Sequence, residues 1–283
     1  MQSDASVGGL ELNPNGQEMY TYEVYFPNDG VLSWSVASDG QLSFLPTNTG
    51  FPLGATAVDF PFSFTANGQY GYTTTVCEYY GDIASVQRQS NGSLEYFNAG
   101  GQTPQSPTWN ILSDPCSQWV AVSSAGYAAM SFSSFMTGYT LMASYSVGPT
   151  GVLTLIPGSE LVPTVNPYQG QAVFDPTGQY LILAGRPPSS YHPAVQVYQL
   201  QSDGRLVALG APQQLSALQN TVLEGVAWDN SNHFYAVLEN CGQNGPCSTE
   251  LYIFNFSGGR LTLAAGAPHN FDGANPGLTV VPR

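Results

Sequence analysis

Four side chains of this sequence have the chemistry to bind a polar ring and to move a proton. Glu23 and Glu239 supply carboxylates, Arg186 a guanidinium group and His192 an imidazole. Such groups serve as general acids, general bases and stabilisers of developing charge. Each lies at, or a few residues beyond, the point where an apolar strand-like run gives way to a loop. These four are therefore the candidate catalytic residues.

Three further polar residues stand at or just beyond the same kind of strand end, and they are candidate ligand-binding groups: Glu78, Thr75 and Ser124. A simpler interpretation stays open for the whole set. A glutamate at a strand end is usually solvated, and an arginine there usually braces its own loop. Under that interpretation His192 is a surface residue.

A repeated hairpin signal orders the segments that must position these residues. Asp-Gly and Asn-Gly between apolar runs are strong signals of a tight hairpin turn, because glycine readily adopts the positive φ that the turn needs. Five related copies occur at steps of 52, 59, 53 and 55 residues. They are SDGQL (38–42), SNGSL (90–94), PTGVL (149–153), SDGRL (202–206) and SGGRL (257–261). A near-constant step of this length indicates an internal repeat.

A second strand-turn-strand motif alternates with the first, so each repeat holds four short strands. Its predicted turn positions are Gly16, Gly68, Ser117, Gly178 and Asn232. Four antiparallel strands repeated in this way predict an all-β protein, a β-propeller of four-stranded blades. A β-sandwich or β-helix is the alternative, but neither explains a four-strand unit of this period. Because the repeat runs end to end, we expect one domain over residues 1–283.

The number of blades is less strongly determined than the fold class. LTVVP at 278–282 matches LELNP at 10–14 position for position, so one inner strand is present twice. One copy would complete the blade begun at the other end of the chain, or belong to an incomplete sixth blade. Five complete repeats favour five blades, and six or seven stay open as alternatives.

The fourth repeat carries a family resemblance. DPTGQYLILA (175–184), followed by VQVYQLQSDGRLVAL (195–209), resembles the repeats of the YVTN and lactonase-type β-propellers. That family is typically seven-bladed, whereas five complete repeats are visible here. It includes sugar-lactone hydrolases and a muconate-type cyclase beside many proteins without known activity. The resemblance implies the fold strongly and an activity only weakly.

The charge balance disfavours several classes of partner. Nineteen acidic residues stand against five arginines and no lysine, which gives a net charge of −14 at pH 7. Nucleic acids, anionic membranes and phosphorylated substrates all recruit basic side chains. We expect a neutral carbohydrate or polyol ligand, or a protein partner, with no nucleic acid, no membrane span and no cofactor. No nucleophile-elbow, phosphate-loop or zinc-protease motif occurs.

Four cysteines suggest an oxidising compartment. Cys241 and Cys247 flank a Gly/Pro loop, which a disulfide would close, and Cys77 with Cys116 would bridge neighbouring blades. Metal binding is the alternative, but no Cys-x-x-Cys or histidine spacing accompanies them. With the low content of charged residues, 8%, this favours an extracellular or periplasmic protein.

Two functions fit the sequence. The first is a secreted, lactonase-like propeller that acts as a non-catalytic binding or assembly module. The second is a hydrolase of unphosphorylated sugar lactones, or a related cyclase, as the family resemblance allows.

Overall fold

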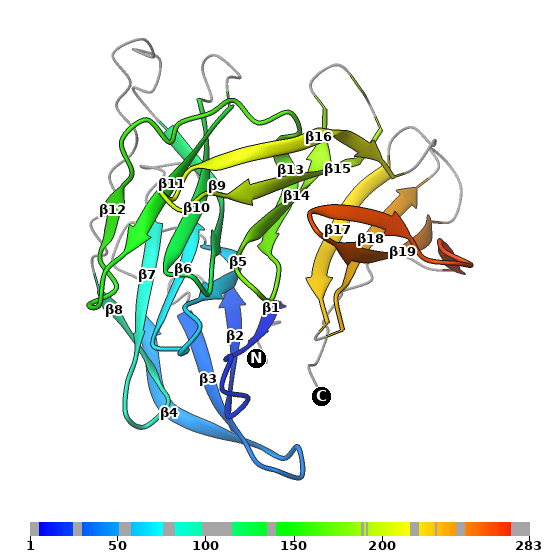
Figure 1. Cartoon of the computed structure of the whole chain (residues 1–283). Helices are drawn as coiled ribbons and strands as arrows, with labels where there is room; N and C mark the ends of the chain where they lie inside the picture. Colours follow the sequence, from blue (N-terminus) through cyan, green and yellow to red (C-terminus); the bar gives the residue numbers. More distant parts are fainter. Residues whose placement is uncertain are drawn as a thin grey trace. The chain divides into compact units, whose positions relative to one another are not determined.

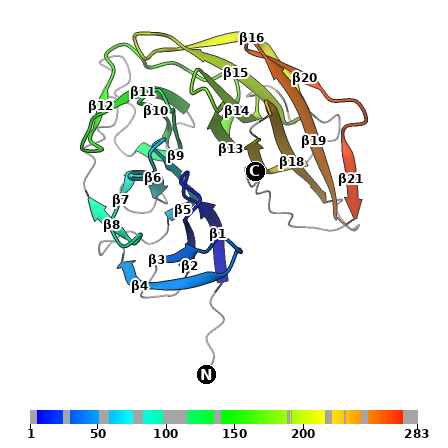
Figure 2. The same cartoon turned by 60° about the horizontal axis from the view of Figure 1, so that its bottom comes forward.

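A computed structural model describes most of the chain, and its described residues are built from β-strands. The described ranges are 6–24, 30–50, 58–75, 83–97, 115–134, 140–187, 190, 192–215, 221–229, 231–241 and 247–272. Within them, no helix is long and apolar enough to cross a membrane. The described strands form five antiparallel sheets, which we number 1 to 5 in chain order (Figures 1 and 2).

Sheets 1 to 3 are each a meander of four strands joined in chain order. Sheet 1 holds β1 (Ser6–Leu12), β2 (Glu18–Val24), β3 (Gly30–Val36) and β4 (Leu42–Gly50). Sheet 2 holds β5 (Val58–Phe64), β6 (Tyr70–Thr75), β7 (Ile83–Arg88) and β8 (Leu94–Phe97). Sheet 3 holds β9 (Pro115–Val122), β10 (Tyr127–Ser134), β11 (Thr140–Val147) and β12 (Leu153–Leu155).

Sheets 4 and 5 repeat the same meander, and sheet 5 gains one strand. Sheet 4 holds β13 (Asn166–Phe174), β14 (Tyr180–Arg186), β15 (Ala194–Leu200) and β16 (Leu206–Gln214). Sheet 5 holds β17 (Thr221–Trp228), β18 (His233–Cys241), β19 (Cys247–Ser257) and β20 (Arg260–Leu263), with β21 (His269–Asp272) paired to β19. Five such sheets are the blades of a five-bladed β-propeller, and this confirms the predicted fold class. The repeated segment at 278–282 lies outside the described residues.

The hairpin signals fall where they were predicted, between the third and fourth strands of every sheet. Gly259, at the tip between β19 and β20, has φ 81°. A Cβ there would lie 2.5 Å from Cδ1 of Leu209 in sheet 4, so the tip also needs glycine for its packing. Asn232 makes the β17–β18 turn with φ 63°, which asparagine tolerates better than most residues.

The predicted turn of the third repeat is wrong. Ser117 lies inside β9, where it pairs with Phe132. The turn between β9 and β10 is instead at Ser123–Gly126, where Gly126 has φ 84° and Ser123 Oγ accepts a hydrogen bond of 3.0 Å from the amide of Ala125. The Asp-Pro-Cys stretch resembled the Asp-Pro-Thr-Gly turn of the fourth repeat, but it has no glycine to supply a positive φ.

The chain divides into two compact units, and residues of sheet 3 contribute to both. Unit 1 comprises residues 1–122, 126–139 and 145–155, and unit 2 comprises 123–125, 140–144 and 156–283. In unit 1 an aromatic and aliphatic core that includes Tyr20, Phe64 and Val86 joins sheets 1 and 2. In unit 2 a larger core joins sheets 4 and 5 and includes Ile182 and Phe234. The expectation of a single domain stays a prediction.

Polar contacts between neighbouring sheets supplement the unit 1 core. The guanidinium group of Arg88 on β7 pairs with Glu18 on β2 at 2.5 Å, and the carboxylate of Glu18 is almost fully buried. The hydroxyl of Tyr20 donates to the carbonyl of Gly92 at 3.2 Å, and that of Tyr72 donates to Gly151 at 2.7 Å. Both tyrosine hydroxyls thus bind the hairpin tip of the next sheet in chain order. The same contact is therefore repeated between sheets 1 and 2 and between sheets 2 and 3.

Asp229 organises the β17–β18 turn of sheet 5. Its carboxylate accepts hydrogen bonds from the amide of Ser231 at 2.8 Å, from Nδ1 of His233 at 2.6 Å and from the hydroxyl of Tyr235 at 3.0 Å. Partial burial works in the opposite direction, but hydrogen bonds from His233, Ser231 and Tyr235 lower the pKa of Asp229 to about 2. The ionised carboxylate therefore holds the turn.

We expect Asp229→Asn to destabilise unit 2 by about 1 kcal/mol at pH 6, because it removes a charged acceptor of several hydrogen bonds. The folded-state pKa lies below the ordinary 3.8, so this stabilisation is present above pH 4 and is lost as the pH falls toward 2. Hydrogen exchange of β18 amides at pH 6 and pH 3 measures the difference. Asp203→Asn, at an exposed hairpin tip, is the control and should change stability by less than about 0.5 kcal/mol. A loss in Asp229→Asn that is equal at both pH values would contradict the assignment.

Candidate functional site

Arg186 ties the end of sheet 4 to the start of sheet 5. It is the last residue of β14, and its Nη2 donates a hydrogen bond of 2.7 Å to the carbonyl oxygen of Thr221, the first residue of β17. Thr221 is fully buried and pairs with Asn240 across the β17–β18 ladder. Arg186 thus braces the neighbouring strand at the margin where Glu239 lies.

A β-bulge in β17 places a glutamate at this margin. The register shifts between Leu223 and Gly225, so Glu224 has no partner of its own on β18. Gln171 of β13 clamps the bulge: its amide nitrogen donates to the carbonyl of Glu224 at 3.3 Å, and its amide oxygen accepts from the nitrogen of Val226 at 3.0 Å. Bulges beside functional sites commonly re-aim a side chain, and here the re-aimed group is a carboxyl.

Glu224 and Glu239 form a carboxyl pair. Glu239 lies on β18, between Val222 of β17 and Thr249 of β19, and is only 8% exposed. Burial, the negative charge of Glu239 and a hydrogen bond to Glu239 all raise the pKa of Glu224. Two neighbouring carboxylates do not both ionise easily, so the pair retains one proton above the pH at which an isolated glutamate loses it. It offers a donor and several acceptors at one place.

A register shift between the first two strands recurs in every sheet, but the acidic residue does not. The first two strands of each sheet shift register between Val7 and Gly9, Asp59 and Ser63, Trp119 and Ser117, Asn166 and Gln171, and Leu223 and Gly225. Of the residues enclosed by these five shifts, Glu224 alone is acidic. The register shift is thus common to all five repeats, and only in sheet 5 does it contain a carboxyl group, that of Glu224.

Sequence reasoning found Glu239 and Arg186 but missed Glu224. The segment TVLEGVAW reads as an apolar strand in which one glutamate precedes a glycine. A charged residue next to glycine inside such a run is the available signal of a bulge. The pairing of Glu224 with Glu239 depends on strand register, which the sequence alone does not display.

His192 lines a cavity of unit 2 to which neither Glu224 nor Glu239 contributes. This cavity has a volume of about 420 Å³, and besides His192 it is lined by Thr164, Pro187, Ser190, Ala194, Pro212 and Gln214. The backbone amide of His192 donates to Ser190 Oγ at 3.1 Å, which fixes the loop between β14 and β15. His192 thus lies at the margin of sheet 4, and the structure does not bring it together with Glu224 and Glu239.

The other candidate residues fall in several places. Glu23 pairs through its backbone with Val7, next to the register shift of sheet 1, where sheet 5 has Leu238 opposite Leu223. The expectation that Glu23 and Glu239 occupy equivalent strand positions is therefore wrong, because the β17–β18 turn is one residue shorter than the β1–β2 turn. The side chain of Glu23 lies outside the described part. Thr75 pairs through its backbone with Val58, and its side chain is likewise not described. Glu78 lies outside the described residues.

Ser124 is not at a strand end. It lies exposed in the β9–β10 turn, with its Oγ 3.5 Å from the carbonyl oxygen of Pro176. This placement corrects the expectation that it follows a strand toward the same margin as Glu239, and it results from the misplaced turn at Ser117. Its proposed contact with a ligand stays untested.

The cysteines are described in part. Cys247 is disulfide-bonded, and its Cα partner across the β18–β19 ladder is Cys241. This geometry favours the predicted Cys241–Cys247 bond. Cys116 pairs through its backbone with Ser133, and Cys77 lies outside the described residues, so the Cys77–Cys116 bond stays a prediction. Within the described ranges, no group of three or more His, Cys, Asp or Glu side chains could hold a metal ion.

One titratable residue of unit 1 was also missed by sequence reasoning. Glu11 lies on β1 opposite Tyr20, which is fully buried. Burial raises the pKa of Glu11 to about 8. A carboxyl group in this position is largely protonated at neutral pH, which gives unit 1 an unusual dependence on pH.

Comparison with known proteins supports the fold and does not identify a family. No family model matches the chain, and no curated protein matches it in sequence. Among solved structures, the periplasmic gluconolactonase PpgL of Pseudomonas aeruginosa is similar with a TM-score of 0.57 and 14% identity, over 94% of this chain and 88% of PpgL. The hydrazine synthase of Kuenenia stuttgartiensis gives a TM-score of 0.56 and 13% identity, over 93% of this chain and 67% of the synthase chain.

Prolyl oligopeptidase B of Galerina marginata is a third similar structure, with a TM-score of 0.52 and 12% identity. The likeness spans 99% of this chain but only 37% of the peptidase. Proteins named for such different activities share this scaffold, so the likeness supports the β-propeller fold alone. An activity has to be argued from the site itself.

Proposed function

We propose that the chain is a secreted, lactonase-like β-propeller of the YVTN type that binds a neutral hydroxylated ligand, a sugar or polyol, in unit 2. It acts as a non-catalytic binding or assembly module. The observation that carries the proposal is the carboxyl pair of Glu224 and Glu239, set at a clamped bulge and braced by Arg186. The disulfide-bonded Cys247 supports an extracellular or periplasmic location.

A shared proton suits the pair to hydroxyl groups. The ionised carboxylate accepts hydrogen bonds from two hydroxyls, while the protonated carboxyl donates one, so adjacent hydroxyls of a sugar find complementary partners. The guanidinium group of Arg186 is engaged with the carbonyl of Thr221, which limits its use as an anion receptor. The negative charge of a phosphorylated sugar would face the carboxyl groups of Glu224 and Glu239, and like charges repel more strongly next to a partly buried group than in bulk water.

Calorimetric titration tests this preference. The probes are D-glucose, D-galactose and myo-inositol, with D-glucose 6-phosphate as the charged counterpart of the first. We expect at least one neutral probe to bind, and glucose 6-phosphate to bind at least about tenfold more weakly than glucose, because each unfavourable charge contact costs on the order of 1 kcal/mol or more. Tighter binding of glucose 6-phosphate would overturn the proposed selectivity.

Hydrolysis of unphosphorylated sugar lactones, or a related cyclisation, is the second candidate function. A specific observation favours it: the raised pKa of Glu224 keeps a proton available for general acid catalysis, next to the carboxyl group of Glu239. The resemblance of the repeats to lactonase-type propellers, and the likeness of the fold to that of a gluconolactonase, are consistent with it.

A panel of unphosphorylated lactones at pH 4 to 7 separates the two functions. If the pair is catalytic, turnover is expected to fall as the pH rises and Glu224 loses its proton, and Glu239→Gln should abolish it. Absence of turnover on every lactone, together with binding of a neutral sugar, supports the binding module instead.

A further inference from the structure

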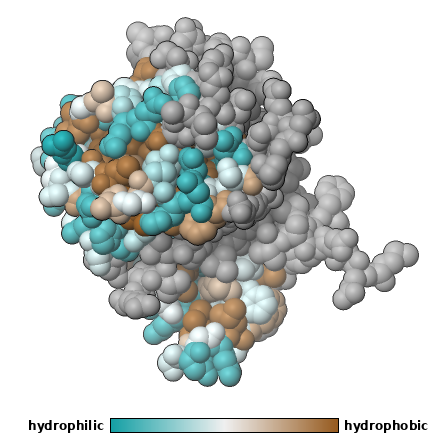
Figure 3. All heavy atoms as spheres, turned by 90° about the vertical axis from the view of Figure 1, so that its right-hand side faces the viewer, coloured by the Kyte–Doolittle hydropathy of each residue, from teal (hydrophilic) through white to brown (hydrophobic). Residues whose placement is uncertain are grey.

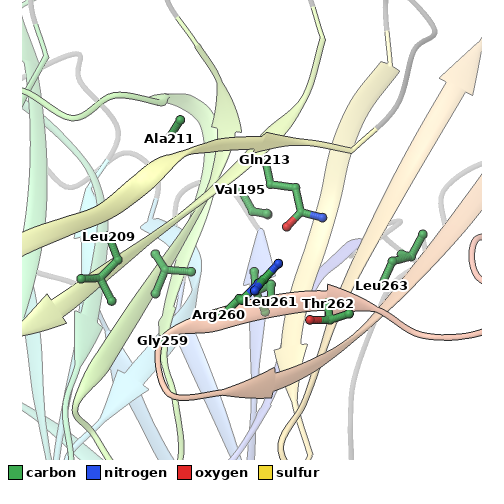
Figure 4. A pocket seen from close by; sticks show the side chains of 10 residues that line it. Val195, Leu209, Ala211, Gln213, Gly259, Arg260, Leu261, Thr262 and Leu263 are labelled. Carbon is green, nitrogen blue, oxygen red and sulfur yellow. The ribbon is translucent and has the colours of Figure 1, made fainter.

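Unit 2 has a second cavity, away from the carboxyl pair, in the groove between the outer strands of sheets 4 and 5. Its volume is about 400 Å³, within the range of small-molecule sites. Figure 4 shows the side chains of Gln213, from β16, and Arg260, from β20, pointing into the space between these strands. We propose that this cavity binds a small monocarboxylate with an apolar body, whose carboxylate pairs with Arg260.

The floor of the cavity is apolar. Val195 and Val197 of β15 are buried there, and Leu261 of β20 faces them from sheet 5. Leu209 closes one end, next to the glycine tip of the β19–β20 hairpin. A branched aliphatic or an aromatic group on this floor would bind favourably because its apolar surface is removed from water.

The polar groups of the cavity suit an anion. Arg260 supplies a guanidinium fork that matches a carboxylate, and the side chains of Gln213 and Thr262 offer further donors beside it. None of the ten residues that line the cavity is acidic, although the protein as a whole carries a charge of −14. Charges elsewhere on the surface are screened beyond about 8 Å at physiological ionic strength.

Arg260 also differs from the other arginines that the structure describes. Arg88 pairs with Glu18, Arg186 donates to a backbone carbonyl, and Arg205 contacts Asp203 and the carbonyl of Pro157. Among the described residues, the guanidinium group of Arg260 has no such partner. In a chain with only five basic residues, an uncommitted arginine over an apolar floor points to an anionic ligand with an apolar body.

The outer surface of the described residues is otherwise mixed in character. Figure 3 shows apolar and hydrophilic residues interspersed over the visible part of it. Leu263, at the edge of the cavity, is 40% exposed. A bound apolar group would cover part of this side chain, which adds a reason for the cavity to prefer an amphiphilic anion to a fully hydrated one.

Methyl-detected NMR of the full chain tests the proposal, because Val195, Val197, Leu209 and Leu261 report directly on the floor. The probe is 4-methylpentanoate, and its neutral amide, 4-methylpentanamide, is the matched control ligand. We expect the acid to shift these four methyl groups in a saturable way and to bind at least about tenfold more tightly than the amide, as a charge-assisted hydrogen-bond pair implies.

Two variants complete the test. Arg260→Gln should weaken binding of 4-methylpentanoate at least about tenfold, whereas Arg205→Gln, which removes an equal charge elsewhere in unit 2, should leave it within about twofold. Equal binding of acid and amide, or equal losses in both variants, would overturn the proposal. So would the absence of saturable shifts in these methyl groups up to about 50 mM 4-methylpentanoate. Binding of sugars at Glu224 and Glu239 does not enter either readout, so this test is independent of the proposed function.

Discussion

Unit 1 is expected to be more stable at pH 5 than at pH 8, and Glu11→Gln is expected to remove most of that difference. Burial raises the pKa of Glu11 to about 8 from an ordinary 4.5. Between these two values the unfolded chain loses the proton that the folded chain retains, so stability falls as the pH rises. Above pH 8 the folded state holds Glu11 as a partly buried carboxylate, which lowers its stability.

The expected size of this effect is large. The shift of the Glu11 pKa from 4.5 to about 8 corresponds to a loss of folding stability of at most about 5 kcal/mol. Because Glu11 is only half-buried, we expect a loss on the order of 2–3 kcal/mol. Glu11→Gln keeps the shape of the side chain and cannot ionise. It should therefore stabilise unit 1 at pH 8 by about 2 kcal/mol and change little at pH 5.

Hydrogen exchange followed by mass spectrometry measures this prediction, with β2 and β3 as the reporters of unit 1. Peptides from β18 in unit 2 serve as an internal reference. Glu95→Gln is the matched control, since it removes an exposed carboxylate of unit 1 and should have no such dependence on pH. Faster exchange of the wild-type β2 strand at pH 5 than at pH 8, after correction for intrinsic rates, would contradict the role of Glu11.

Glu239→Gln is expected to have the largest effect on ligand binding. Burial, the charge of Glu239 and a hydrogen bond to Glu239 raise the pKa of Glu224. The substitution replaces the carboxyl group of Glu239 by an amide that cannot ionise, so the pair no longer shares a proton. Loss of a charge-assisted hydrogen bond in a buried site costs about 1.5–3 kcal/mol, or roughly 10- to 150-fold in affinity for a neutral sugar. Glu224→Gln should cause a similar loss, since either residue alone is incomplete.

The two single variants and the double variant separate a functional pair from two independent carboxylates. If Glu224 and Glu239 act together, the double variant should bind no more weakly than the worse single variant, within a factor of about three. Glu160→Gln, elsewhere in unit 2, is the control and should bind as the wild type does. Additive losses from the two glutamates would contradict a shared proton.

The pH dependence of binding follows from the same pair. Because burial, together with the charge of Glu239 and a hydrogen bond to it, raises the pKa of Glu224 above the ordinary 4.5, the proton-sharing state extends to a higher pH than for an isolated glutamate. Affinity for a neutral sugar should therefore decline as the pH rises through this raised value. In Glu239→Gln the decline should begin at a lower pH.

The repeat architecture could be predicted from the sequence because local chemistry specifies it. Hairpin tips such as Gly204 and Gly259 need glycine for a positive φ, and Asn232 is one of the few substitutes, so the turns were visible without any tertiary information. The prediction failed where that signal changed. Gly126 follows Ser-Ser-Ala instead of Asn or Asp, and the nearby Asp-Pro stretch drew the turn nine residues too early.

Only part of the candidate site could be predicted from the sequence, for a different reason. Glu239 and Arg186 follow from their positions at strand ends, but Glu224 acquires its role from a bulge that depends on the pairing of β17 with β18 and on the clamp from Gln171 in another sheet. The burial of Glu11 likewise arises from packing and not from its neighbours in sequence. Strand register and the burial of a side chain depend on tertiary structure, so they cannot be predicted from the amino-acid pattern alone.

A crystal structure of the protein soaked with the tightest-binding neutral sugar at pH 5 tests the central claim most directly. The account predicts density for the sugar with hydroxyl oxygens within hydrogen-bond distance of both Glu224 and Glu239, and no such density in crystals of Glu239→Gln soaked in the same way. Sugar density elsewhere on the molecule with the carboxyl pair empty, or unchanged density in the variant, would contradict it.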